Sequence, residues 1–382
     1  MVQALAQRIE AVNQQAIAEG RIVGSVVLVA HRGTVIYAGA SGYADREQQR
    51  PMRRSSQFRL SSVSKPYITL VAMRMVEQQR LNLDDAVSRW LPWFTPALPD
   101  GRQPEIRIRH LLIHTAGLDY RFKQTADGPY HRLGIQDGME MSALTLEQNL
   151  RRLADAPLQA APGSTFNYSL AIDVLGAVLE KVAGMPLPAL FAQSVSEPLE
   201  LRNTGFYAED PSNLAIAYYN AEPHPLPMHN GILLSLSDQG IFALELAPSR
   251  AFDRYVYPSA GAGMVGDADD VLRLVEVLRH GRKGVLQPET AKLMRMPHVG
   301  ADAETQGPGW GFGFGGAILV DAALAATPQH NGTMQWGGVY GHSWFYDPVA
   351  QLSVVALTNT AFEGMCGLYP VQIRDAVYGI GV

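Results

Sequence analysis

The N-terminal end of the chain has the hydrophobic pattern of a surface helix followed by a β-hairpin. The helix is predicted over residues 2–19, where apolar residues recur at helical spacing: Leu5, Ile9, Val12 and Ile17. Two β-branched runs then flank His31-Arg32-Gly33, and this arrangement predicts two antiparallel strands joined by a tight turn.

The C-terminal end shows a related pattern, with the hairpin before the helix. An Asp347-Pro348 turn separates two further apolar runs, and residues 371–378 are typical of a helix. Hairpins and helices at both ends predict an antiparallel sheet that is assembled from distant parts of the chain and covered by the terminal helices.

Between these ends the pattern changes from strands to helices. Helical spacing of apolar residues, interrupted by loops rich in glycine and proline, occurs in residues 68–79, 108–114, 146–153 and 170–182. We therefore predict an α+β fold with two domains. Residues 1–69 and 206–382 form a discontinuous sheet domain, and residues 70–205 form an inserted, mainly helical domain.

The composition of the 382-residue chain is that of a soluble globular protein, with 47% hydrophobic and 18% charged residues. A net charge of −5, with no basic cluster interleaved with aromatic residues, argues against a nucleic-acid partner. The longest apolar stretch, residues 22–30, contains Gly24 and Ser25 and is too short to span a bilayer. We therefore expect a small-molecule partner and neither nucleic acid nor a membrane; the oligomeric state stays open.

Cysteine usage and the start of the chain bear on the compartment. Cys366 has no second cysteine with which to form an internal disulfide, which suits a reducing environment. The first residues are charged and amphipathic and lack the apolar core of a signal peptide. We expect a cytoplasmic protein, with an exported protein trimmed of its signal as the alternative.

The stretch "FRLSSVSKPY" contains a pairing that suggests chemistry. Ser62 and Lys65 have i, i+3 spacing, which places both on one face of a helix. The helix that follows is apolar nearly all round, so it should be buried and should keep the lysine partly desolvated. Desolvation favours a neutral amine, which could take the serine proton and leave Ser62 a usable nucleophile. Spacing alone leaves a solvent-facing lysine as an equal alternative.

A tyrosine supplies context for this pair. Tyr168 follows a Pro162-Gly163 turn and precedes a helical run, and a tyrosine beside a Ser/Lys pair can relay a proton to a leaving group. Taken alone, a core tyrosine with one hydrogen bond is the better interpretation. A second candidate, Tyr218 in a Tyr-x-Asn match, lacks the preceding turn and ranks below it.

Five segments in order along the chain resemble the serine β-lactamase-like superfamily, and particularly the family VIII carboxylesterases, which share their fold with class C β-lactamases. The segments are "SSVSKP", "IRHLLIHTAGL", "PGSTFNYSLAIDVLG", "SAGAGMVGDADDVLRL" and "QWGGVYGHSWF". The resemblance covers nearly the whole chain. It implies a β-lactamase-like fold in which an antiparallel sheet is flanked by N- and C-terminal helices, with an inserted helical domain and a cleft between the two.

The resemblance also implies roles for individual residues. Ser62 matches the acylated nucleophile, Lys65 its base and Tyr168 the residue that shuttles protons. The oxyanion hole would be formed by the backbone N–H groups of Ser62 and Val339. No cofactor and no metal are implied.

Two departures from the β-lactamase pattern favour a neutral ester over an anionic β-lactam. Trp336-Gly337-Gly338 stands where β-lactamases have Lys-Thr-Gly, so a lysine that helps to hold a substrate carboxylate is replaced by an apolar, stacking surface. Tyr168-Ser169-Leu170 stands where they usually have Tyr-x-Asn, so an amide is replaced by an apolar group.

The predicted function is therefore that of a serine carboxylesterase that hydrolyses short-chain acyl esters through an acyl-enzyme on Ser62. The alternatives are a β-lactamase or D-amino-acid peptidase of the same fold, and a catalytically silent homologue used for binding. An α/β-hydrolase is disfavoured because the chain has no Gly-x-Ser-x-Gly. His110 and His114 have zinc-ligand spacing, but no third ligand accompanies them, so we predict a structural role.

A long loop over residues 119–141 is expected to overhang the cleft, because loops of this length often shape binding sites. Its large residues would then limit the size of the acyl or alcohol group; otherwise they anchor the loop to the helical domain. The predicted pocket residues of this loop are Tyr120, Tyr130, Leu133, Ile135 and Met139.

Overall fold

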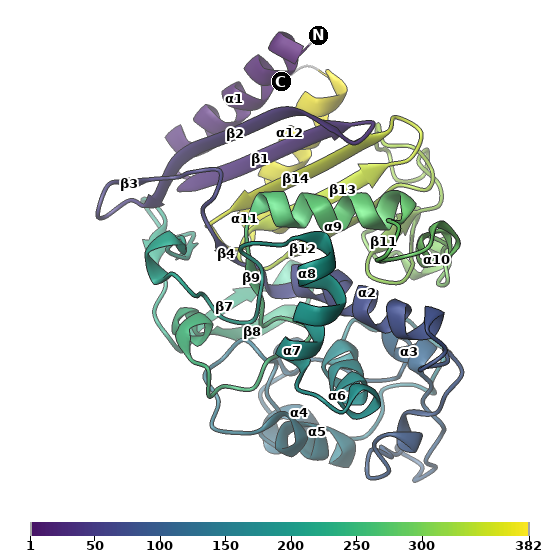
Figure 1. Cartoon of the computed structure of the whole chain (residues 1–382). Coiled ribbons are helices and arrows are strands. Elements are labelled where there is room, and N and C mark those ends of the chain that lie inside the picture. The colour runs from purple at the N-terminus through teal and green to yellow at the C-terminus, as the bar shows by residue number, and fades with distance from the viewer. Residues whose placement is uncertain (1, 381–382) are drawn as a thin grey trace.

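An eight-stranded antiparallel sheet forms one half of the molecule, and a group of helices lies against its lower edge in the view of Figure 1. The computed structural model describes residues 2–380. The strand order in the sheet is β10-β11-β12-β13-β14-β1-β2-β3, so both ends of the chain contribute to it. The predicted assembly from distant segments is confirmed.

The strands outside the sheet form three small two-stranded pairs, β4–β9, β5–β6 and β7–β8. The strands of the chain are β1 Gly24–His31, β2 Thr34–Asp45, β3 Arg50–Pro51, β4 Phe58–Arg59, β5 Tyr218–Tyr219, β6 Leu226–Pro227, β7 Ile232–Leu236, β8 Ile241–Leu246, β9 Val265–Gly266, β10 Trp310–Phe312, β11 Ala317–Leu319, β12 Met334–Gly338, β13 His342–Asp347 and β14 Leu352–Thr358.

The helices are unevenly distributed along the chain, and most of them lie between β4 and β5. They are α1 Val2–Ala18, α2 Ser64–Glu77, α3 Ile108–Leu112, α4 Pro129–Arg132, α5 Leu146–Asp155, α6 Ala171–Ala183, α7 Leu187–Phe191, α8 Glu197–Leu199, α9 Ala268–His280, α10 Pro288–Met294, α11 Glu363–Cys366 and α12 Leu368–Tyr378. The predicted helices correspond to α1, α2, α3, α5, α6 and α12, with ends shifted by a few residues.

Both predicted hairpins are present. The turn between β1 and β2 uses Arg32 and Gly33, whose φ angles of +52° and +79° explain why a glycine is suited to the second position. In the other hairpin, Asp347 ends β13 and its carboxylate accepts hydrogen bonds from the backbone of Val349 and Ala350, each at 2.9 Å. A short polar residue therefore fixes the second turn.

Helices cover both faces of the sheet. Helices α1 and α12 pack together on one face, where a separate apolar cluster includes Ile9, Val27 and Tyr369. Helix α9 lies against the opposite face, over β13, β14 and β1. Because the central strands are covered on both faces, β1 and β14 are buried almost throughout and read as continuous apolar runs.

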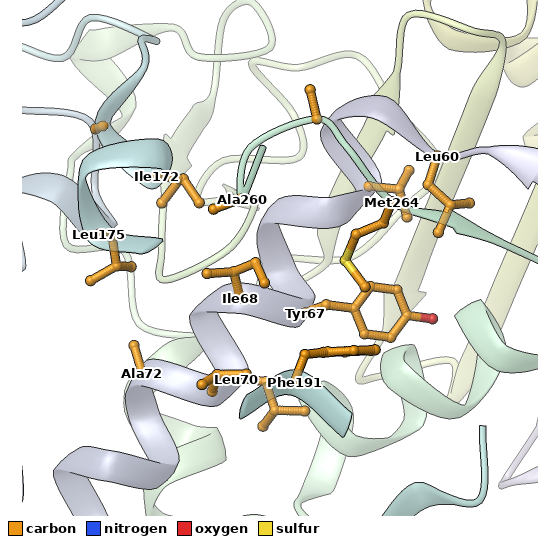
Figure 2. Close-up of a cluster of buried hydrophobic side chains, with 14 of the residues drawn as sticks. Leu60, Tyr67, Ile68, Leu70, Ala72, Ile172, Leu175, Phe191, Ala260 and Met264 are labelled. Atoms are coloured by element: carbon orange, nitrogen blue, oxygen red, sulfur yellow. The ribbon is translucent and has the colours of Figure 1, made fainter. Parts of the chain in front are cut away.

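Helix α2 is the buried centre of the helical half. Figure 2 shows Ile68 and Ala72 of this helix facing Ile172 and Leu175 of α6, while Tyr67 packs against Phe191 of α7. The helix is therefore fixed on several sides, and the short 3₁₀ turn that precedes it, Ser61–Val63, meets the sheet at β12.

Two further predictions concern the extent of the domains and the membrane. The division at residues 69/70 and 205/206 stays a prediction.

No single helix in residues 2–380 is long and apolar enough to cross a bilayer. Helix α6 and the segment Leu187–Leu199 together have the length and composition of a membrane span, but a 79° bend separates them.

Candidate active site

Ser62 lies at the junction between the sheet and α2. It occupies a one-turn 3₁₀ helix, Ser61–Val63, immediately before α2. Ser61 is fully buried with φ of +44°, a strained conformation for a residue with a side chain, and such strain persists only where the surroundings impose it. The constraint comes from β12, because a Cβ atom added to Gly338 would lie 2.5 Å from both Leu60 O and Ser61 Oγ.

Lys65 lies one turn after Ser62 and is only 2% exposed. Its Nζ donates to the backbone oxygen of Gly261 at 2.8 Å and lies 3.1 Å from Ser62 Oγ. The amine also sits 4.6 Å from the centre of the Tyr168 ring. The lysine predicted to be desolvated is therefore buried, and its amine is within proton-transfer distance of the serine.

Tyr168 reaches Ser62 from the other side, out of the loop that precedes α6. Its hydroxyl donates to Ser62 Oγ at 2.8 Å and accepts from Trp336 Nε1 at 3.4 Å. The backbone oxygen of Tyr168 accepts from Lys123 Nζ at 3.1 Å. The structure thus brings Ser62, Lys65 and Tyr168 together.

Tyr218, the lower-ranked tyrosine, is used elsewhere. It is fully buried in β5, and its hydroxyl donates to the Glu47 carboxylate while accepting from the N–H of Arg46 at 2.9 Å. Both hydrogen bonds of this hydroxyl are made with the turn between β2 and β3, so Tyr218 stabilises that turn.

His114 packs against the ring of Tyr168 and binds the backbone next to it. Its ring lies 4.6 Å from the Tyr168 ring, and its Nδ1 accepts the N–H of Ser169 at 3.2 Å. Burial, followed by the charges of Lys65 and Lys123, holds the pKa of His114 well below its usual 6.5. The imidazole is therefore neutral and acts as a packing and backbone-binding group.

His110 likewise binds backbone, since its Nδ1 accepts the N–H of Arg107 at 3.1 Å at the start of α3. Within residues 2–380 there is no cluster of three His, Cys, Asp or Glu side chains with the geometry of a metal site.

The two N–H groups expected to form an oxyanion hole lie at the same cavity. Ser62 and Val339 both line it. Val339 directly follows β12, and its carbonyl accepts from Phe362 N at 3.0 Å, whereas no acceptor for its N–H is found in the described chain. That N–H is available for a substrate oxygen.

The cavity has a volume of about 620 Å³ and extends from Ser62 past β12 toward α12. Around Ser62 its wall is largely aromatic and apolar, as is typical of a small-molecule site. The aromatic and apolar residues that line the cavity include Tyr120, Phe122, Met139, Phe166, Tyr168, Ile241, Trp310, Trp336 and Val339.

The predicted binding residues are only partly on this wall. Trp336, Gly337, Tyr120 and Met139 line the cavity. Gly338 does not; its backbone is packed against the Ser61–Val63 turn, where a side chain would clash. It therefore shapes the site without facing substrate.

The placement of the other three loop residues corrects the prediction. Tyr130 is 1% exposed, and its hydroxyl accepts the N–H of Asp119 at 2.9 Å, so it ties the loop to itself. Ile135 is fully buried, and Leu133 packs on the same core. All three lie outside the cavity lining because the loop turns them inward, which is the anchoring alternative.

Sequence reasoning did not identify several wall residues. Phe166 lies within the Tyr168 motif and could have been found from its position two residues earlier. Phe122 and Trp310 carry no local signal that separates them from core aromatics. The Gly261 carbonyl, which accepts from Lys65, is a backbone group and leaves no trace in residue type.

Comparisons with known proteins agree with this geometry. The family model described as Beta-lactamase matches residues 5–372. The chain is 50% identical to "Esterase EstB" of Burkholderia gladioli over 374 residues, covering 98% of this chain and 95% of that protein. The solved structure of "EstCE1, a hydrolase with promiscuous acyltransferase activity" matches with a TM-score of 0.98 at 72% identity, over 99% of each chain.

A more distant structure shares the fold alone. The LovD6 mutant of simvastatin synthase from Aspergillus terreus matches with a TM-score of 0.76 at 22% identity, covering 97% of this chain and 94% of that one.

The fold and the Ser–Lys–Tyr cluster define a serine hydrolase of the β-lactamase type. The chain belongs to the Beta-lactamase family, and its similarity to EstB and EstCE1 confirms the resemblance to the family VIII carboxylesterases.

Proposed function

We propose that this chain, a serine carboxylesterase with the β-lactamase fold, hydrolyses short-chain acyl esters through an acyl-enzyme on Ser62. One observation supports the proposal most strongly. At the cavity wall, Ser62 Oγ lies 3.1 Å from Lys65 Nζ and 2.8 Å from the Tyr168 hydroxyl. Lys65 can therefore take the proton of Ser62, while Tyr168 can give its own proton to the leaving group.

Acylation begins when Ser62 Oγ attacks the ester carbonyl carbon and its proton passes to the Lys65 amine. The carbonyl oxygen becomes an oxyanion, which accepts from the N–H groups of Ser62 and Val339. Losing one such donor typically costs about 2.7–4 kcal/mol of transition-state stabilisation. Tyr168 already donates to Ser62 Oγ, which leaves the serine proton free to point at the amine.

The tetrahedral intermediate then collapses. The bond to the alkoxide breaks, and the Tyr168 hydroxyl gives its proton to the departing oxygen. Lys65 returns its proton to the Tyr168 phenolate, which restores both groups. Water attacks the acyl-enzyme by the same route in reverse, and the acid leaves as Ser62 regains its proton.

The charges at the cavity favour a neutral substrate. Its two cationic lining residues in the described chain are already paired, Lys123 with Asp119 at 3.2 Å and Arg374 with Asp375 at 2.7 Å. Trp336 presents a ring where β-lactamases present a lysine. Among the lining residues of the described chain, no unpaired cation is therefore left to hold a substrate carboxylate.

The test compares esters with a β-lactam in the same preparation. Turnover of p-nitrophenyl acetate and butyrate should fall by at least about a thousandfold in Ser62→Ala, because the covalent route is lost. Nitrocefin should be turned over far more slowly than either ester. Undiminished ester turnover in Ser62→Ala would refute the proposal, and a higher kcat/KM for nitrocefin than for the esters would favour a β-lactamase.

Transfer of the acyl group to an alcohol is a second candidate function. EstCE1, the structural relative at 72% identity, is described as a hydrolase with promiscuous acyltransferase activity. In this chain, Phe166, Trp310 and Trp336 line the same cavity as Ser62 and favour an apolar alcohol over water as the second substrate. Benzyl acetate formed from vinyl acetate and benzyl alcohol in water would support transfer; acetate as the sole product would exclude it.

A further inference from the structure

Asp173 is a buried carboxylate that the mechanism above does not use. It lies in the first turn of α6, within the apolar run "LAIDVLG", and is 1% exposed. Neither of its oxygens makes a well-formed hydrogen bond to any described residue. A buried carboxylate without a partner is costly, so its presence here calls for a function.

Gly261 connects this carboxylate with the active site. Its carbonyl oxygen accepts from Lys65 Nζ at 2.8 Å. A Cβ atom added to Gly261 would lie 2.9 Å from Asp173 Oδ2 and 3.5 Å from Lys65 Nζ. The carboxylate and the amine therefore approach the same glycine, without forming a direct ion pair.

The segment around Gly261 is held firmly against α6. A Cβ atom on Gly176 would lie 2.7 Å from the Ala260 side chain, and Figure 2 shows Ala260 next to Ile172. The Ser259 hydroxyl and the Gly261 N–H both lie close enough to the Asp173 carboxylate to favour its ionised form, although neither has the alignment of a full hydrogen bond.

We propose that Asp173 is a positioning residue for Lys65. Its carboxylate lies against Gly261, whose carbonyl takes one N–H of the lysine, and so limits where that carbonyl can sit. Its negative charge also stabilises the ammonium that forms when Ser62 gives up its proton. The inference rests on the proposed role of Lys65 as the base, and it completes the arrangement in which a base is oriented by a third group.

The groups that face Asp173 come from several elements. Burial raises the pKa of Asp173 above its usual value, while Ser259, Lys65, Gly261 and the more distant Arg250 oppose that rise. Tyr120 and Tyr257 also interact with its charge, and burial raises the pKa of both phenols. Lys65 is thus the reacting group through which the charge of Asp173 can affect the chemistry.

The test is the pH profile of kcat/KM for p-nitrophenyl acetate in Asp173→Asn. We expect kcat to fall 10–100-fold with KM nearly unchanged. The acidic limb should move to lower pH, because the negative charge that favours protonation of a neighbouring group is gone. Glu180→Gln, on the same helix, removes a part-buried carboxylate that accepts the N–H of Leu187 at 2.7 Å and should leave the profile in place.

A profile in Asp173→Asn identical to that of the wild type would overturn the inference. So would a uniform loss of activity at every pH together with a lower Tm, since that is the signature of a purely structural role. Gly261→Ala provides a second route if Asp173→Asn does not fold, because the added methyl group would force apart the carboxylate and the amine. It should lower kcat more than it raises KM.

The wild type separates this inference from the proposed function. Ester turnover that is lost in Ser62→Ala supports the proposed function whatever Asp173→Asn shows. Wild-type protein without ester turnover would refute the proposed function, and the inference that rests on it would fall with it.

Discussion

Replacing Tyr168 with phenylalanine removes a single oxygen from the centre of the site. The ring contacts remain, since the Tyr168 ring lies 4.6 Å from His114 and 5.1 Å from Trp336. The hydrogen bonds to Ser62 Oγ and from Trp336 Nε1 are lost. A neutral hydrogen bond contributes about 0.5–1.5 kcal/mol net, so the free energy of unfolding should change by no more than about 2 kcal/mol.

The effect on the chemistry should depend on the leaving group. General acid catalysis contributes about 10²–10⁴-fold, so kcat/KM for an alkyl ester such as ethyl butyrate should fall by that factor in Tyr168→Phe. A p-nitrophenolate leaves without being protonated, so p-nitrophenyl butyrate should lose only about tenfold, from the missing bond to Ser62.

The assay is the ratio of the two losses, measured with wild type and variant at one pH. Urea unfolding serves as the control for folding. Equal losses for the two esters would contradict the assignment of Tyr168 as the residue that protonates the leaving group. A loss below about threefold for both would show that the hydroxyl takes no part in catalysis.

Three further predictions concern the wall, the strand and the pH dependence. Met139→Trp should lower kcat/KM for hexanoate relative to acetate by about tenfold, because it fills a cavity wall; an unchanged chain-length profile would count against that placement. Gly338→Ala should cost about 1–3 kcal/mol of unfolding free energy and about 10²-fold in kcat, since its Cβ would meet Leu60 O at 2.5 Å; Gly300→Ala, where the same atom meets open space, should be neutral in both assays. Burial lowers the pKa of His342 from 6.5 to about 4, so stability present above pH 6.5 should be lost as the pH falls toward 4, by about 2 kcal/mol between pH 6.5 and 5; urea unfolding of His342→Gln should show a flatter dependence, and an equal slope would refute the assignment.

Much of the fold follows from local patterns. The hairpins around Arg32-Gly33 and after Asp347 were predictable because their turn residues are chemically distinctive and the strands flanking them are strongly apolar. The small pairs β5–β6 and β7–β8 were not predicted, since short strands between long loops carry little periodicity.

The reacting residues were easier to predict than the walls around them. Ser62 and Lys65 are linked by helical spacing, a geometric constraint that survives in the sequence. Met139 and Ile135 are both apolar loop residues, and only the path of the backbone decides which of them meets the cavity. Asp173 did leave a signal, a carboxylate within an apolar run, but its meaning depends on Gly261, which is remote in sequence.

The most direct measurement of the central claim is the site of covalent labelling by a fluorophosphonate, found by peptide mass mapping. We predict one adduct per chain, on Ser62, with ester turnover lost in proportion to labelling. Ser62→Ala should take no label, and Lys65→Met should be labelled far more slowly, because its nucleophile lacks a base. Labelling of another residue, or full turnover in protein labelled at Ser62, would contradict the account.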